Sequence, residues 1–98
     1  MKDMINVAGF KVFPREVEEV LFEHPAVAEV AVLGRPDPVK GEVVHACVVL
    51  RPGQSTTAEE LIERCRGRVA SYKVPVAVEF LPALPKSPTG KILKKNLR

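Results

Sequence analysis

The sequence predicts a single α+β domain over residues 1–98: a small sheet of about three main strands plus an N-terminal β-ribbon, packed against two to three helices. Runs rich in β-branched residues at 26–34, 42–50 and 76–81 alternate with amphipathic stretches that begin with helix-start signals. With 98 residues and a hydrophobic content of 46%, the chain has enough apolar side chains for one modest core.

The first stretch, MINVAGFKVFP, predicts a short β-ribbon that turns at Ala8-Gly9, because apolar residues alternate on both sides of the glycine. Pro14 then suits the first turn of a helix, where a missing N–H is tolerated. This helix carries glutamates early, where the helix dipole favours them, and valines and a leucine along one face. We expect it to end at His24-Pro25, since the residue before a proline disfavours helical geometry.

The middle of the chain predicts two strands, at 26–34 and 42–50, joined by a loop at 35–41 that contains two prolines. The second run is apolar on both faces except at His45, which indicates a central strand with a partly buried histidine.

The rest of the chain predicts a second helix, a third strand and a short final helix. Thr57 to Glu60 form a capping box, from which a helix carries Leu61, Ile62, Cys65 and Val69 inward. The proline-rich stretch after the strand at 76–81 predicts a loop, and KILKKNLR predicts a last helix that begins at Lys91.

Charge and composition exclude several classes of function. The net charge is +3, and five basic residues with no acidic one lie between Leu84 and Arg98. This tail has no aromatic residue, which disfavours a nucleic-acid partner. No apolar run approaches the roughly 20 residues of a spanning helix, and the N-terminus lacks signal-peptide features, so we expect no membrane span and a cytoplasmic location. Cys47 and Cys65 indicate reduced core cysteines, with a disulfide or a metal site as the alternative.

The stretch PKSPTGK, from Pro85 to Lys91, resembles a phosphate-binding loop but departs from that motif. Pro85 replaces its first glycine, and Ile92, which follows the lysine, cannot ligate Mg²⁺ as Ser or Thr would. Two prolines restrict the backbone of the loop, whereas Gly90 allows a wide range of backbone conformations at one position. The pattern therefore indicates a loop that delivers one lysine to an anionic site completed elsewhere, with a merely solvated lysine as the alternative.

Four motifs together carry a resemblance to a known family: DMINVAGFKVFPREVEEVL, HPAVAEVAVLGRPDPVKGE, SYKVP and LPKSPTGKILKKNLR. In their order and spacing they resemble the C-terminal domain of acyl-CoA synthetases, which belong to the adenylate-forming enzymes. The resemblance runs over residues 2–98. The Thr/Ser/Gly-rich phosphate loop of the family's large N-terminal domain is absent from the sequence.

The resemblance implies that a large N-terminal domain of the same enzyme binds ATP with Mg²⁺ and a carboxylic acid, while this domain closes over it in two orientations. It implies that Lys91, in a loop with Thr89 and Gly90, serves adenylation as the catalytic lysine. The residues implied to contact coenzyme A are Ala8, Gly9, Phe10, Lys11, Tyr72 and Lys73. Lys2 and Asp3 match the hinge, which is expected within residues 1–3. No metal site is expected in this domain.

Two other functions remain open at this stage. One is the corresponding domain of a peptide-synthetase adenylation unit, which passes the acyl group to a carrier-protein thiol. The other is a non-catalytic interaction module that holds an acidic partner with its basic tail. Under the leading interpretation the chain is part of an acid–thiol ligase and is catalytically silent in isolation.

Overall fold

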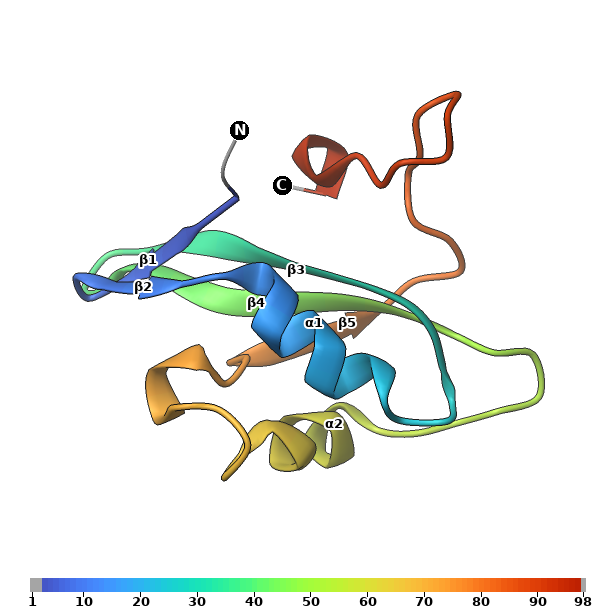
Figure 1. Cartoon of the computed structure of the whole chain (residues 1–98), viewed down its shortest axis with the longest axis horizontal. Helices are drawn as coiled ribbons and strands as arrows, with labels where there is room; N and C mark the ends of the chain where they lie inside the picture. Colours follow the sequence, from blue (N-terminus) through green and yellow to red (C-terminus); the bar gives the residue numbers. More distant parts are fainter. Residues whose placement is uncertain (1–2, 98) are drawn as a thin grey trace.

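The computed structural model describes residues 3–97, so the expected hinge residue Lys2 lies outside the described residues. One five-stranded sheet runs in the order β2-β1-β4-β3, with β5 also paired to β4 (Figure 1). The strands are β1 (Ile5–Val7), β2 (Phe10–Val12), β3 (Val27–Asp37), β4 (Gly41–Leu50) and β5 (Ala77–Phe80). The helices are α1 (Pro14–Phe22), α2 (Ala58–Cys65) and the 3₁₀ helices η1 (Ser71–Lys73) and η2 (Lys94–Leu97). The predicted α+β class, with three main strands and a ribbon, is confirmed.

Strand β4 is central, as its apolar faces predict, since it pairs antiparallel with β1 and β3 and parallel with β5. The predicted loop at 35–41 is mostly wrong: β3 continues through Pro36, which pairs with Glu42, and only residues 38–40 form the turn. A proline is tolerated there because β3 is an edge strand, so its missing N–H costs no ladder hydrogen bond.

The ribbon turns at Ala8-Gly9, as predicted. Both residues have positive φ, 52° and 89°, which is the type I′ geometry whose twist matches that of the flanking strands. The Ala8 N–H donates to the carbonyl of Lys40 at 2.8 Å, and the Gly9 N–H donates to Asn6 Oδ1 at 2.9 Å. The tip of the ribbon is therefore held against the β3–β4 turn.

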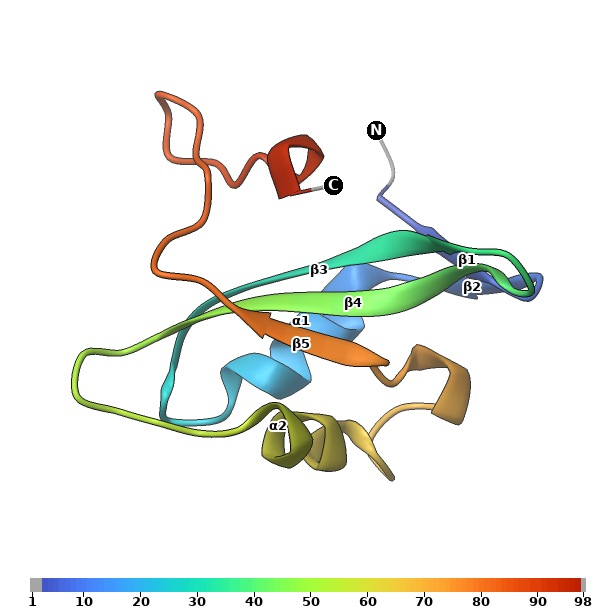
Figure 2. The same cartoon turned by 180° about the vertical axis from the view of Figure 1, so that it is seen from behind.

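The two faces of the sheet are covered differently. Helices α1 and α2 lie on one face and the C-terminal segment lies on the other (Figures 1 and 2). The helix side holds the larger core, which includes Ile5, Val12, Val17, Leu21, Val32, Val48 and Leu61. The other side holds a smaller cluster of Ala31, Leu33, Cys47 and Leu84, against which Leu81, Ile92 and Leu97 pack. Both cysteines are buried free thiols, as predicted.

Helix α2 begins with half of the predicted capping box. Thr57 Oγ1 accepts from the Glu60 N–H at 3.1 Å, but the Glu60 carboxylate accepts from the Thr56 hydroxyl and bonds to His24 instead. The helix ends at Cys65, so Val69, expected on its inner face, packs on the core from beyond it. No helix within residues 3–97 is long and apolar enough to cross a membrane.

The predicted helix starting at Lys91 is wrong. The backbone there forms a small hairpin, in which Lys86 and Ile92 make a β-bridge and the Leu93 N–H donates to the Pro85 carbonyl at 2.8 Å. These cross-strand bonds compete with the i to i−4 bonds of a helix. Only the 3₁₀ turn η2, at Lys94–Leu97, remains helical.

Candidate functional site

The hairpin at 85–93 holds Lys91 at the end of a tight turn. The Gly90 N–H donates to the Ser87 carbonyl at 2.9 Å, and the Ser87 N–H donates to the Lys91 carbonyl at 2.8 Å. Gly90 has φ of 89°, a conformation that residues with a Cβ rarely adopt. The backbone on both sides of Lys91 is therefore restrained although the loop is exposed.

Ser87 shapes this turn and was missed as a site residue by the sequence analysis. Its Oγ accepts from the Lys91 N–H at 3.2 Å and lies 2.9 Å from Thr89 Oγ1. The signal available in the sequence was a serine a few residues before a glycine, a pattern typical of side-chain-supported turns. Thr89 is thus brought beside Ser87, and both hydroxyls lie near the start of the Lys91 side chain.

Lys91 is the exposed cation of this loop, and its ammonium makes no ion pair with any residue from 3 to 97. Two neighbouring lysines, Lys86 and Lys94, differ from Lys91 in this respect. Lys86 Nζ lies 2.9 Å from Glu29 Oε2, and Lys94 is paired with Asp3 and, at 2.9 Å, with Glu18. An unpaired ammonium on a restrained backbone is suited to approach an anion supplied from outside this chain.

The ribbon carries the second group of expected site residues. Phe10 is 56% exposed, and its ring stacks on Tyr72 with centroids 4.7 Å apart. A Cβ built on Gly9 would meet no atom of the chain within 4 Å, so space beside the turn is open. Ala8 and Lys11 are also exposed. The fold therefore brings the ribbon and η1 together although they are far apart in the sequence.

Lys73, another of the expected site residues, is ion-paired within the chain. Its Nζ lies 2.8 Å from Glu16 Oε1 and 5.8 Å from the centroid of the Tyr72 ring. The hydrogen bond to Glu16 raises the pKa of Lys73 above its ordinary value. This pair ties η1 to the first turn of α1 and so supports the position of Tyr72 beneath Phe10.

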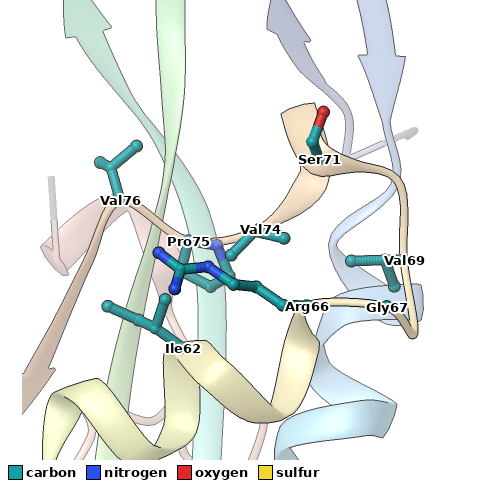
Figure 3. Close-up of a pocket in the computed structure, with 8 residues that line it drawn as sticks. All are labelled: Ile62, Arg66, Gly67, Val69, Ser71, Val74, Pro75 and Val76. Carbon is teal, nitrogen blue, oxygen red and sulfur yellow. The ribbon is translucent and has the colours of Figure 1, made fainter.

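A hollow of about 420 Å³ lies between α2 and the segment that carries η1 into β5. Figure 3 shows the Arg66 side chain reaching across it, over Pro75, toward Ile62 and Val76. The Arg66 guanidinium bonds to Glu63 at 2.8 Å. The hollow is thus an apolar recess crossed by a paired cation, and the sequence analysis did not single it out.

The two groups of expected site residues lie toward opposite ends of the molecule. The tip of the ribbon is at one end of the long axis and the hairpin of Lys91 is near the other (Figures 1 and 2). The remaining expected residue, Asp3, is ion-paired with Lys94 Nζ at 2.6 Å, which joins the start of the chain to η2.

The fold and the exposed lysine loop define a member of a known class. Residues 16–91 match the family model described as AMP-binding enzyme C-terminal domain, so the chain belongs to that family. The chain is 50% identical over 96 residues to a long-chain-fatty-acid–CoA ligase of Bacillus subtilis, covering 98% of this chain and 17% of that protein. It is 48% identical to a mitochondrial acyl-coenzyme A synthetase of Homo sapiens, covering 98% of this chain and 18% of that protein.

Solved structures agree with this placement. A Mycobacterium tuberculosis fatty acyl CoA synthetase superposes with a TM-score of 0.91 at 45% identity, over 98% of this chain and 19% of that one. Apo MatB from Rhodopseudomonas palustris superposes with a TM-score of 0.96 at 36% identity, over 99% and 19%. The chain thus spans less than a fifth of the length of these relatives.

Proposed function

We propose that this chain acts as the mobile C-terminal domain of an ATP-dependent acyl-CoA synthetase, which converts a carboxylic acid, ATP and coenzyme A to acyl-CoA, AMP and pyrophosphate. The observation that carries the proposal is the exposed Lys91, which makes no ion pair with any of residues 3–97 and stands on a restrained hairpin away from the ribbon. The first half-reaction uses one end and the second uses the other.

In the first half-reaction an oxygen of the acid carboxylate attacks the α-phosphorus of ATP, and pyrophosphate leaves. This step brings anions together, and the Lys91 ammonium offsets the charge that develops in the transition state. Thr89 and Gly90 shape the approach of the loop. We assign the Mg²⁺ that accompanies ATP to the phosphates and the N-terminal domain, because Ile92, which follows Lys91, cannot ligate the ion as Ser or Thr would.

In the second half-reaction the sulfur of coenzyme A attacks the acyl carbon, and AMP leaves. The open space beside Gly9 suits a thin pantetheine arm, because none of residues 3–97 other than its chain neighbours comes within 4 Å of a Cβ placed there. Ala8, Phe10 and Tyr72 would line that approach, and the exposed Lys11 would face the anionic groups of coenzyme A. Lys73 then acts chiefly by holding Tyr72 through Glu16.

A carrier protein is a second candidate for the thiol that accepts the acyl group, and one comparison favours it. The chain is 47% identical to a fatty acid–[acyl-carrier-protein] ligase of Streptomyces coeruleorubidus, over all of this chain and 19% of that protein. A carrier-protein thiol in place of free coenzyme A would use the same ribbon. An interaction module with a basic tail is disfavoured, because Lys86 and Lys94 of that tail already pair with acidic residues of the chain.

The test is Lys91→Ala in the full-length parent enzyme, with Lys95→Ala as a control that removes another exposed cation from the same segment. We expect acid-dependent pyrophosphate exchange to fall by about 10²–10³, as for the loss of one transition-state charge contact. Thioester formation from a supplied acyl-adenylate should be largely spared. Equal losses in both half-reactions would contradict the assignment. Coenzyme A and a phosphopantetheinyl carrier protein, compared as acceptors, distinguish the two candidates.

A further inference from the structure

Three different metal-ligating side chains meet on the face of the sheet that the C-terminal segment covers. His45 and Cys47 are two residues apart on β4 and therefore face the same side, and Glu79 on β5 is the register partner of Cys47. Their ligand atoms, an imidazole nitrogen, a sulfur and a carboxylate oxygen, all lie within 4.8 Å of one another. They form the only such group of three among residues 3–97.

From this geometry we propose that His45, Cys47 and Glu79 form a binding site for a borderline-soft divalent cation of the Zn²⁺ class. Tetrahedral zinc, with bonds of about 2.0–2.3 Å, sets its ligands about 3.3–3.8 Å apart. His45 Nε2 and Glu79 Oε1, which lie 3.3 Å apart, are already at this spacing, and a separation at the 4.8 Å limit would need to close by about 1 Å. Glu79, whose side chain is 50% exposed, can supply that movement by a change of rotamer. The sulfur and nitrogen disfavour Mg²⁺ and Ca²⁺, which take oxygen ligands.

The hydrogen bond between His45 and Glu79 in the absence of an ion is weak enough for metal coordination to replace it. His45 Nε2 and Glu79 Oε1 lie 3.3 Å apart, longer than the 2.7–3.2 Å typical of such hydrogen bonds. The Cys47 sulfur lies in the small cluster with Ala31, Leu33 and Leu84, so one ligand comes from an apolar, water-poor wall. Burial raises the pKa of the Cys47 thiol, and its proton passes to solvent when the metal binds.

One of the three ligands is exposed, and one coordination position would stay open. His45 is nearly buried and Cys47 is fully buried, so the ion reaches them past the exposed carboxylate of Glu79. Three protein ligands leave a fourth position for water, as in zinc sites that are not purely structural. Because two ligands lie on β4 and one on β5, the bound ion would join two strands that share only four paired residues. Binding should therefore raise the thermal stability of the domain by mass action.

Titration of the untagged 98-residue chain with Co²⁺, a spectroscopic substitute for Zn²⁺, tests the site. We expect one equivalent to bind, with thiolate-to-cobalt charge-transfer absorption that added Zn²⁺ abolishes by displacement. Cys47→Ser should remove the charge-transfer band, and Cys65→Ser is the matched control, because it changes an equally buried cysteine that lies outside the group.

Glu79→Gln keeps the test decisive if Cys47→Ser unfolds the domain, since residue 79 is exposed. This variant should weaken Co²⁺ and Zn²⁺ binding about ten-fold or more. His24→Gln, which alters a histidine that bonds to Glu60 and Ala26 and lies outside the group, should leave the affinity unchanged. The proposal is overturned if the wild-type chain gives no charge-transfer band, if the band survives in Cys47→Ser, or if Glu79→Gln binds as tightly as the wild type.

Discussion

Phe10 and Tyr72 stack with their ring planes 29° apart, and this contact joins the tip of the β-ribbon to the 3₁₀ helix η1. Phe10 remains more than half exposed in the stack. The pair therefore combines a tertiary contact of this domain with a flat apolar surface that faces outward. Under the proposed function, that surface belongs to the approach of the thiol substrate.

Replacement of either ring should separate the two half-reactions. We expect Phe10→Ala and Tyr72→Ala to raise the KM for coenzyme A in the full-length enzyme while pyrophosphate exchange persists. In the isolated chain each should lower the free energy of unfolding, and a double-mutant cycle should give a coupling of about 0.5–1.5 kcal/mol. Phe22→Ala is the control, because Phe22 is similarly exposed, at 52%, on α1. An unchanged KM in both ring variants would remove the ribbon from the acceptor site.

Gly9→Leu should impair thioester formation and spare adenylation. The leucine meets no atom of this domain near its Cβ, so any obstruction would come from a substrate or from the N-terminal domain. The positive φ of residue 9 adds backbone strain of about 1–2 kcal/mol. Gly53→Leu is the matched control, since Gly53 also has positive φ and open surroundings. Acyl-CoA production and pyrophosphate exchange are the two readouts, and a parallel fall in both would make Gly9 a turn residue only.

The stability of the domain should depend on Glu60 in acid. The Ala26 N–H donates to His24 Nδ1, so Nε2 carries the proton that His24 donates to Glu60 at 3.0 Å. That bond, followed by the one from the Thr56 hydroxyl, holds the pKa of Glu60 below its ordinary value of 4.5. A carboxyl group whose pKa is lower in the folded than in the unfolded state stabilises the fold at pH values above its unfolded-state pKa. This contribution is lost as the pH falls through the folded-state pKa.

Urea unfolding of the isolated chain at about pH 6 and about pH 3 measures this effect. Glu60→Gln should lose less unfolding free energy over that range than the wild type. Glu59→Gln, which changes an exposed neighbour in the same helical turn, should keep the wild-type dependence. Identical pH dependences for the wild type and Glu60→Gln would refute the assignment.

The isolated chain should bind coenzyme A and ATP no better than about millimolar, near −4 kcal/mol. The ribbon and the Lys91 hairpin are both exposed and lie toward opposite ends, so each offers only one wall of a site. Calorimetric titration of the 98-residue chain is the measurement. Micromolar binding of either ligand would indicate a complete site within this domain and would contradict its proposed role as a closing domain.

The sequence by itself determined the features that depend on neighbouring residues. The turn of the ribbon at Ala8-Gly9 follows from the glycine and the apolar alternation around it, and the start of α1 at Pro14 follows from the proline itself. The central place of β4 follows from its two apolar faces. The PKSPTGK motif was sufficient to single out Lys91 as the expected adenylation lysine.

Only the tertiary structure decided which distant side chains meet. The stack of Phe10 on Tyr72 and the contact of Cys47 with Glu79 depend on sheet register and on the packing of η1, which local patterns do not encode. The local pattern also placed Lys91 at a helix start, whereas hydrogen bonds across the hairpin to Pro85 outweighed helix propensity there. Propensities are worth fractions of a kcal/mol per residue, so a few long-range bonds and a buried apolar cluster override them.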